Sequence, residues 1–252
     1  VCPSGSSCYI APPRLRLRVA LQGPWDAQAG LMRDGLRQQG LLPTTEPYSA
    51  MGYSYLNNEA PLTVPASMFN TTGPNAIVDW VLVELITNGE VRARVPALLQ
   101  CDRDVVATNG DSLLRFNLPR GVYWVAVRHR NHLVGARTNN TSFFGNAAQV
   151  TRDLSLPFGM EFAETDVNGV SLMIAGNVTG DHQVKYTGAN NDRDPILLRI
   201  GGTTPTSVLH GQYRSEDVNM DGDIKYTGAG NDRDTILINV GGTTPTAVRT
   251  AF

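Results

Sequence analysis

The chain repeats one segment of itself. Residues 177–208 (NVTGDHQVKYTGANNDRDPILLRIGGTTPTSV) return as residues 217–248 (DVNMDGDIKYTGAGNDRDTILINVGGTTPTAV), a period of about 40 within a chain of 252 residues. Such a period is typical of architectures in which a supersecondary unit packs against its own copy, because one short unit cannot bury its apolar face alone. The C-terminal part is therefore predicted to be a small domain made of two related units.

The second copy opens with alternating oxygen-bearing side chains around a glycine. These side chains follow the calcium-loop pattern D-x-[DN]-x-[DN]-G, with Gly222 at its sixth position: Asp217, Asn219, Asp221 and Asp223. This spacing wraps oxygens around a hard cation, and the glycine permits the sharp turn. The acidic residue usual at the twelfth position is replaced by glycine. We expect residues 226–230 to be an insertion, and either Asp232 or Asp234 to supply the late carboxylate at the start of a helix over 234–240.

The first copy suggests how these late aspartates divide their roles. Pro195 directly follows Asp194, which suits an N-cap residue followed by the first helical position. On this interpretation Asp194 and Asp234 cap their helices, while Asp192 and Asp232 bind the metal. The alternative is that all four only cap and solvate the helix starts.

The loop of the first copy has lost most of its charge. Its side chains at the alternating positions are Asn177, Thr179, Asp181 and Gln183. His182 replaces the turn glycine, so we expect this loop to bind calcium more weakly or to remain empty. Upstream, Asp166 and Asn168 form either a truncated third loop or, as we favour, a plain Asx-turn.

The chain before the repeat has the texture of an antiparallel β-protein. Residues 14–21 alternate arginine with apolar residues, which predicts a strand with one wet face. Further strands are predicted at residues 77–85, 97–100, 112–118 and 122–127, separated by Gly, Asn and Pro. Trp80 and Trp124 lie mid-strand and are predicted to anchor the core. A short helix is expected around 27–38.

These patterns predict three segments. Residues 1–13 form a flexible or exchanged lead-in, residues 14–156 an antiparallel β-sandwich, and residues 157–252 the duplicated calcium-binding domain with short helices. The boundary is placed near Pro157, where apolar runs shorten and Gly, Asp, Asn and Thr take over.

The DVNMDG core of the second copy resembles the dockerin-like, EF-hand-type calcium repeats of secreted bacterial proteins. The KYTGAGNDRD extension departs from that pattern, and the predicted helices are shorter than those with which dockerins bind cohesins. Residues 14–252 as a whole resemble secreted surface proteins of the Bacteroidota, through VDWVLVEL at 78–85 and VRHRNHL at 127–133. The resemblance implies secretion to the extracellular space or cell surface and Ca2+ as the cofactor. It implies no catalytic activity.

Composition excludes several partners. The net charge of −2 and the pI near 6.1 provide no basic surface for nucleic acid, and no apolar run is long enough for a membrane span. Cys2 and Cys8 are spaced for a small disulfide loop, with three free thiols as the alternative. The only two lysines, Lys185 and Lys225, occupy matching places in the repeat, which points to a structural role.

No sequence motif points to an enzyme. The chain lacks a nucleophile elbow, a zinc-protease helix and a phosphate loop. The most tempting cluster is Arg128–His132 (RHRNH), which has no acidic neighbour in sequence; we interpret it as a hydrogen-bonded turn. We therefore expect a protein that is not an enzyme.

We expect a structural protein, a calcium-stiffened subunit that self-associates into a homopolymer, as in a bacterial surface filament or matrix. The most specific version of this hypothesis is assembly by N-terminal strand exchange. It predicts that removal of residues 1–21 abolishes assembly but leaves a folded monomer. The alternative is a calcium-dependent adhesin or carbohydrate-binding module, with Tyr48, Tyr53 and Tyr55 stacking on glycans.

Overall fold

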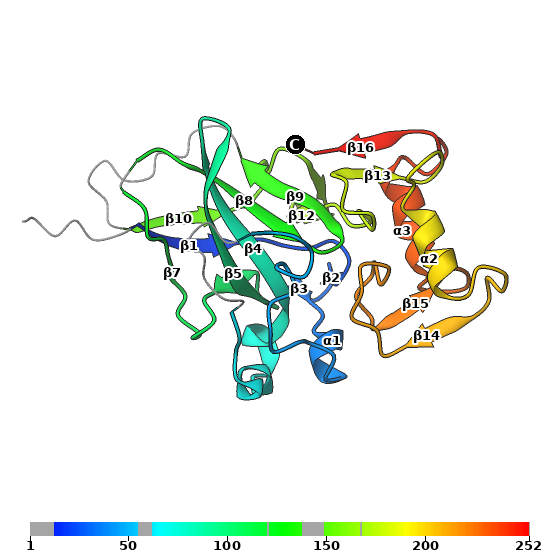
Figure 1. The fold of residues 1–252 in the computed structure, drawn as a ribbon, viewed down its shortest axis with the longest axis horizontal. Helices are drawn as coiled ribbons and strands as arrows, with labels where there is room; N and C mark the ends of the chain where they lie inside the picture. The colour runs from blue at the N-terminus through cyan, green and yellow to red at the C-terminus, as the bar shows by residue number, and fades with distance from the viewer. Residues whose placement is uncertain (1–12, 55–61, 120, 138–148, 167, 252) are drawn as a thin grey trace, which may run out of the picture.

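A computed structural model describes residues 13–54, 62–119, 121–137, 149–166 and 168–251 (Figure 1). The fold is mainly β, with antiparallel sheets and a few short helices. Cys2, Cys8 and Tyr55 lie outside the described residues.

The elements before the repeat are mostly strands. In chain order they are β1 (Arg14–Arg18), β2 (Trp25–Asp26), β3 (Leu31–Met32), α1 (Gly35–Gln38), the 3-10 helices η1 (Ala66–Asn70) and η2 (Gly73–Asn75), β4 (Ile77–Thr87), β5 (Glu90–Gln100), β6 (Asp104–Val106), β7 (Leu114–Arg115), β8 (Trp124–His129), β9 (His132–Arg137), β10 (Gln149–Asp153), β11 (Ala163–Thr165) and β12 (Ser171–Met173). The long β4–β5 hairpin turns at Asn88-Gly89, the strongest local hairpin signal in this region.

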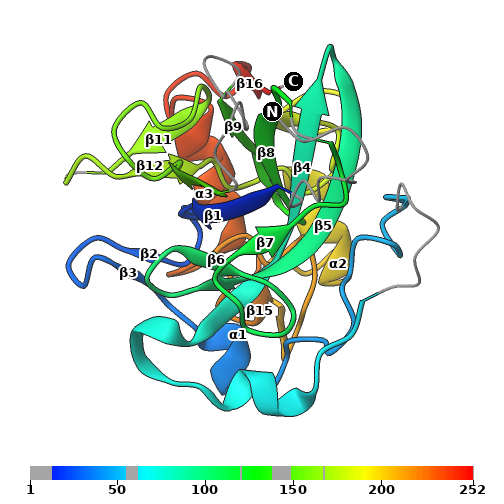
Figure 2. The same cartoon turned by 90° about the vertical axis from the view of Figure 1, so that its left-hand side faces the viewer.

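Eight strands form one sheet in the order β10-β1-β6-β5-β4-β8-β9, with β7 also paired to β1. Only the β1–β10 pair within it is parallel. Strand β1 is not an edge strand: it lies between β10 on one side and β6 and β7 on the other (Figure 2).

A short segment connects the continuation of β1 with the edge strand β9. The Met173 N–H donates to the Ala20 carbonyl after β1 (2.8 Å), and the Leu133 N–H of β9 donates to the Ile174 carbonyl (2.8 Å). The chain that follows β12 thus lies between the continuation of β1 and β9. Residues shortly after the expected boundary at Pro157 are therefore hydrogen-bonded to the large sheet, and the duplicated unit begins at about Asn177.

Strands β4 and β8 are buried on both faces. If one face of β4 met water, successive positions would alternate between buried and exposed, yet the whole run Ile77–Ile86 is buried. In β8, Val125 and Val127 join the main core around Trp80, whereas Ala126 faces a second apolar cluster. This two-sided burial explains why these strands read as continuous apolar runs.

The repeat folds as two interlocked copies. The first contributes β13 (Gln183–Lys185), α2 (Arg193–Arg199) and β14 (Val208–His210), and the second contributes β15 (Asp223–Lys225), α3 (Asp232–Asn239) and β16 (Val248–Thr250). Strand β13 pairs with β16, and β14 pairs with β15, so the last strand of each copy pairs with the first strand of the other. Figure 1 shows α2 and α3 between these two small sheets.

The exchange is reciprocal at the level of side chains. The Thr187 hydroxyl donates to the Pro245 carbonyl (3.0 Å), and the equivalent Thr227 hydroxyl donates to the Pro205 carbonyl (2.9 Å). Neither copy pairs its own two strands, so each copy completes a small sheet of the other.

The second apolar cluster fixes the unit to the sheet. From the repeat it takes equivalent pairs of buried residues, and from the sheet it takes Ala126, Leu133, Val134 and Ala136. The equivalent pairs are Val184 and Ile224, Ile196 and Ile236, and Ile200 and Val240. The unit therefore packs against β8 and β9 instead of extending away on a linker.

Several expected boundaries differ from the structure. The helix around 27–38 is wrong over most of its length: residues 25–32 form the small β2–β3 hairpin, and only Gly35–Gln38 are helical. The strand expected at 112–118 shortens to Leu114–Arg115. Strand β5 starts well before residue 97 and contains Pro96, and α3 begins two residues before Asp234.

The position of β1 argues against the expectation that a chain without residues 1–21 stays folded. Leu15 and Leu17 are buried, and β1 has partners on both sides. Its removal would separate β10 from β6 and β7, because both the apolar contacts and the strand hydrogen bonds would be lost.

Substitution in β1 tests this placement. Leu17→Ala is expected to lower the free energy of unfolding by about 2–5 kcal/mol, as for other buried leucines. Arg16→Ala, on the exposed face of the same strand, is the control and is expected to change it by less than about 0.5 kcal/mol. Urea unfolding measures both, and equal small losses would contradict an interior position of β1.

Candidate metal centre

In the second copy, the oxygen-bearing side chains accept hydrogen bonds from backbone N–H groups of their own loop. The Asp217 carboxylate accepts hydrogen bonds from the N–H groups of Asp221 (3.1 Å) and Gly222 (3.0 Å). Asn219 Oδ1 accepts from Asp221 N–H (2.8 Å), and Asp221 Oδ1 accepts from Asp223 N–H (2.9 Å). Each side chain thus caps the backbone two or more residues ahead, as in successive Asx-turns. The spacing read from the sequence produces a closed loop.

The turn at the sixth position requires a left-handed backbone. Gly222 has φ of 86°, and a Cβ there would lie 2.7 Å from Gln39 Oε1 and 2.9 Å from Leu41 Cδ1. His182 keeps the same left-handed turn in the first copy with φ of 67°. The loop shape therefore survives in the first copy, at the cost of local strain.

Asp232 closes the loop, and Asp234 does not. The Asp232 carboxylate is fully buried and accepts from Val218 N–H (2.7 Å) and Lys225 N–H (2.8 Å). The side chain of Asp234 is 49% exposed and forms an ion pair with Arg233 (2.8 Å). The structure thus separates two candidates that are only two residues apart in sequence.

Asn231 is the N-cap residue of α3, and its counterpart Asn191, one residue before the N-cap position of α2, makes the same side-chain bond. Asn231 Oδ1 accepts from Asp234 N–H (2.9 Å), and Asn191 Oδ1 accepts from Asp194 N–H (2.9 Å). The assignment of Asp194 and Asp234 as caps is therefore wrong. An asparagine three residues upstream reaches the free N–H of the first turn, which an aspartate within that turn cannot do.

Burial disfavours the charged form of two carboxylates in the second loop. Burial raises the pKa of Asp232 to about 8; the Lys225 N–H bond opposes this rise, and the charge of Asp217 adds to it. Burial likewise raises the pKa of Asp217 to about 7, against the attraction of Arg130 and with repulsion from Asp221. A set of buried oxygen donors that repel one another fits a hard divalent cation, which would compensate their charge.

The donors are gathered along the loop without converging on one point. Among the residues that the structure describes, no three His, Cys, Asp or Glu side chains are arranged to hold a metal ion. Binding of a cation by this loop would therefore require its carboxylates to move together.

The first copy has the same frame with fewer charges. Asp192, the counterpart of Asp232, accepts from Thr179 N–H (2.9 Å) and Lys185 N–H (2.8 Å), and burial raises its pKa to about 6. Asp181 accepts from Gln183 N–H (3.0 Å). Asn177 Oδ1 is buried and has no hydrogen-bond partner among the described residues. An orphaned acceptor at this position is compatible with a cation, although the donor set is less acidic than that of the second copy.

Asp166 forms an Asx-turn, as expected. Its Oδ1 accepts from Asn168 N–H (2.9 Å) and Val170 N–H (2.7 Å), and its Oδ2 accepts from the Trp25 indole (2.8 Å). Both oxygens are engaged in structural bonds.

A set of six polar side chains, most of them buried, holds the second loop against the sheet. We name this set the anchor cluster. Its members are Asp79, His129, Arg130, Asn131, His132 and Tyr213. Asp79 accepts from the Tyr213 hydroxyl (2.6 Å), Arg130 Nε (3.1 Å) and its neighbour Trp80 N–H (2.7 Å), and it lies 3.1 Å from His129 Nε2. The RHRNH segment thus has an acidic partner after all, supplied by β4 across the β4–β8 pair. Sequence alone gave no register by which to find it.

The hydrogen bonds assign the tautomers of the two histidines. His132 Nε2 accepts from Gly23 N–H (3.1 Å), so its proton lies on Nδ1, which faces His129 Nδ1 (3.0 Å) and Asn131 Oδ1 (2.8 Å). His129 then carries its proton on Nε2, toward Asp79. Both rings are buried and act as neutral links in one chain of hydrogen bonds.

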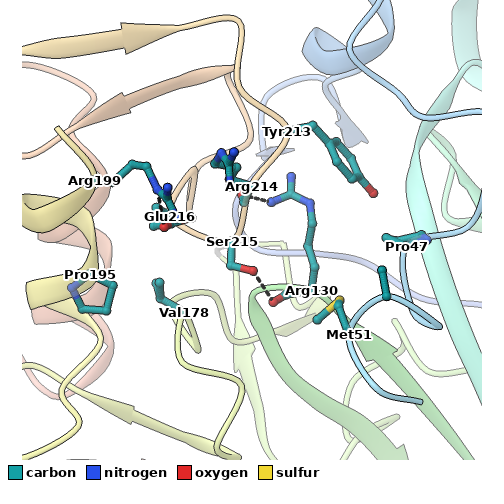
Figure 3. Close-up of a pocket in the computed structure, with 11 residues that line it drawn as sticks. Pro47, Met51, Arg130, Val178, Pro195, Arg199, Tyr213, Arg214, Ser215 and Glu216 are labelled. Atoms are coloured by element: carbon teal, nitrogen blue, oxygen red, sulfur yellow. Dashed lines mark hydrogen bonds and ion pairs between the residues drawn. The ribbon is translucent and has the colours of Figure 1, made fainter. Parts of the chain in front are cut away.

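The anchor cluster forms hydrogen bonds with the linker between the two copies, at residues 214–217. Arg130 Nη1 donates to the Arg214 carbonyl, the Ser215 hydroxyl donates to the Arg130 carbonyl (3.1 Å), and Asn131 Nδ2 donates to the Asp217 carbonyl (2.6 Å). Figure 3 shows the contacts of Arg130 with Arg214 and Ser215, beside a cavity of about 480 Å³ that is also lined by Met51 and Pro195. The first residue of the second loop is therefore fastened directly to the β8–β9 turn.

Two of the three tyrosines considered for glycan stacking, Tyr48 and Tyr53, are described, and both make contacts within the protein. Tyr48 is buried, and its hydroxyl donates to the Trp80 carbonyl (2.8 Å). The Tyr53 ring lies 5.8 Å from the guanidinium groups of both Arg94 and Arg128. Tyr48 is therefore a core residue and cannot stack on a sugar.

Because His129 and His132 are buried, we predict that the free energy of unfolding falls in acid. Burial lowers the pKa of both, and neighbouring Arg130 opposes their protonation, whereas Asp79 favours that of His129. Below pH of about 6.5 the unfolded chain binds protons that the folded chain does not, so stability present above this pH is lost as the pH falls.

Comparison with His132→Gln isolates this effect, because the carboxylates titrate alike in both proteins. Between pH 7.5 and pH 5.0, the wild type is expected to lose up to about 2 kcal/mol more unfolding free energy than the variant. Urea unfolding at each pH measures the difference. Equal losses in the two proteins would show that His132 is not held neutral.

Comparison with known proteins identifies no relative: no protein-family model, no curated protein and no solved structure matches the chain. None of the described helices is long and apolar enough to cross a membrane.

Proposed function

We propose that this chain is a non-catalytic, extracellular structural protein in which calcium stiffens the duplicated unit. The observation that carries the proposal is the loop of the second copy. Asp217 and Asp232 are both fully buried there, repel each other, and are joined to the loop backbone by hydrogen bonds.

The proposed ligands follow from the placement of the side chains. In the second copy they are Asp217, Asn219, Asp221, Asp223 and Asp232, and in the weaker first copy Asn177, Thr179, Asp181, Gln183 and Asp192. Asp194 and Asp234 are left out because their carboxylates pair with Arg193 and Arg233. Calcium would supply the positive charge that the buried carboxylates lack.

A structural role is supported by how the unit is attached. The anchor cluster and the second apolar cluster connect it to the large sheet, so a cation that orders the loop would also order the junction. We further propose a β-sandwich-like first domain, a dockerin-like second domain, and self-association of copies into a homopolymer at the cell surface. Strand exchange in this setting would place β1 of a neighbour in the interior position that β1 occupies here. No contact of the described tyrosines favours glycan binding.

The calcium proposal is tested by unfolding with and without the ion. At a calcium concentration about 100-fold above Kd, the wild type is expected to gain about 2.7 kcal/mol. Asp232→Asn should lose most of this gain, whereas the control Asp234→Asn should retain it. Because each variant is compared with itself in chelator, a general loss of stability does not affect the result. A wild type indifferent to millimolar calcium would refute calcium binding.

The structural role is tested by negative-stain microscopy of the full chain. Regular filaments are expected in calcium, and they should loosen or dissolve in chelator. Asp232→Asn in calcium should resemble the wild type in chelator. Compact monomers of the wild type in both conditions would contradict a filament subunit while leaving calcium binding to be judged by the unfolding experiment.

A further inference from the structure

The chain uses lysine at only two places. Lys185 and Lys225 stand at equivalent positions of the two copies, and every other basic side chain apart from histidine is arginine. The two residue types are not interchangeable, since lysine carries a compact point charge and arginine a broad planar one. A chain that selects arginine elsewhere and lysine twice at one structural position has a specific use for the smaller cation.

Both lysines point their ammonium groups at loop carboxylates. Lys225 Nζ lies 3.5 Å from Asp221 Oδ2 and 3.4 Å from Asp223 Oδ2. Lys185 Nζ lies 3.6 Å from Asp181 Oδ2, the counterpart of Asp221. The lysine side chains are only 22% and 17% exposed, respectively, so these charges are partly withdrawn from water.

The backbone of each lysine is built into the same loop. Lys225 N–H donates to Asp232 Oδ2 and Lys185 N–H donates to Asp192 Oδ2, each at 2.8 Å. One residue therefore contacts the late carboxylate through its backbone and the early carboxylates through its side chain. This double attachment makes the position of the ammonium group a property of the loop rather than of a free surface side chain.

We propose that Lys225 is an internal cation of the second loop, which holds Asp221 and Asp223 in the calcium-free protein and must release Asp221 when calcium binds. This inference rests on the proposed function and specifies how the same site is regulated. Release of the ammonium group opposes calcium binding, so Lys225 sets the affinity. It also keeps the loop ordered when calcium is scarce, because the carboxylates retain one positive neighbour.

The two copies differ in how much of the negative charge of the loop the lysine neutralises. Lys225 faces two carboxylates, and the buried Asp217 and Asp232 add further negative charge to the loop. In the first copy Lys185 faces Asp181 alone, and the positions of Asn177, Thr179 and Gln183 carry no charge. Lysine therefore leaves an excess of negative charge for a cation in the second copy and little in the first.

Isothermal titration of the full chain with calcium chloride, after removal of chelator, tests the inference. Lys225→Met is expected to bind calcium at the second loop at least about fivefold more tightly than the wild type, because a positive charge about 4 Å from the ligands is removed. Without calcium, the same variant should unfold at a lower urea concentration. Lys185→Met is the matched control and should leave the affinity of the second loop unchanged. Asp232→Asn identifies which binding event belongs to that loop.

The outcomes separate the two proposals. A wild type that binds calcium, together with a Lys225→Met affinity that is unchanged or weaker, would overturn the role of Lys225 and leave the calcium site intact. Failure of both the wild type and Lys225→Met to bind calcium would overturn the proposed function and this inference with it. Equal tightening by Lys185→Met and Lys225→Met would show a general effect of net charge, and would also overturn the specific role.

Discussion

The carboxylate of Asp79 is the interaction on which the arrangement of the molecule depends. It is fully buried, and its partners come from three parts of the chain: its own strand, the β8–β9 turn and the linker between the two copies. Although burial would raise the pKa of Asp79, the attraction of Arg130 and the bonds from His129 and Tyr213 hold it below its ordinary value. A buried charge is tolerated only when it is paired and hydrogen-bonded in this way. This requirement acts together with the second apolar cluster to position the duplicated unit against the sheet.

The junction between the sheet and the duplicated unit also fixes the position of the first residue of the second loop. Asn131 belongs to the anchor cluster and bonds to the carbonyl of Asp217, the first residue of the loop. Gly23 approaches from the other side, where a Cβ would lie 2.4 Å from the Val218 carbonyl. The loop is thus positioned by the sheet on two sides, whereas its own carboxylates shape its interior. Order in the loop and order at the junction are coupled through these shared backbone groups.

The extension that separates this repeat from standard calcium loops lies between the first strand and the helix of each copy. The residues between β15 and α3 include Tyr226, on which Arg233 packs at 5.0 Å, and Asn231, which bonds to the Gly228 carbonyl and caps the helix. Equivalent contacts join Arg193 to Tyr186 and Asn191 to Gly188 in the first copy. The extension is a compact turn with its own hydrogen bonds. It delivers the late aspartate to the loop from the first residue of the helix, in place of the twelfth loop position.

The sequence by itself determined features that depend on neighbours along the chain. The duplication, the oxygen-rich loop, the alternating strand β1 and the core position of Trp80 were all readable, because Asx-turns and strand faces arise from spacing within a few residues. The sequence interpretation also favoured Asp232 over Asp234 as the late carboxylate. Only the tertiary structure decided that Asn231 rather than Asp234 caps the helix, that Asp79 is the partner of His129 and Arg130, and that each copy completes the other's small sheet. These outcomes depend on which buried groups meet across strands and copies far apart in sequence. No local pattern encodes that register, because it is selected by the requirement that every buried charge and backbone group find a partner.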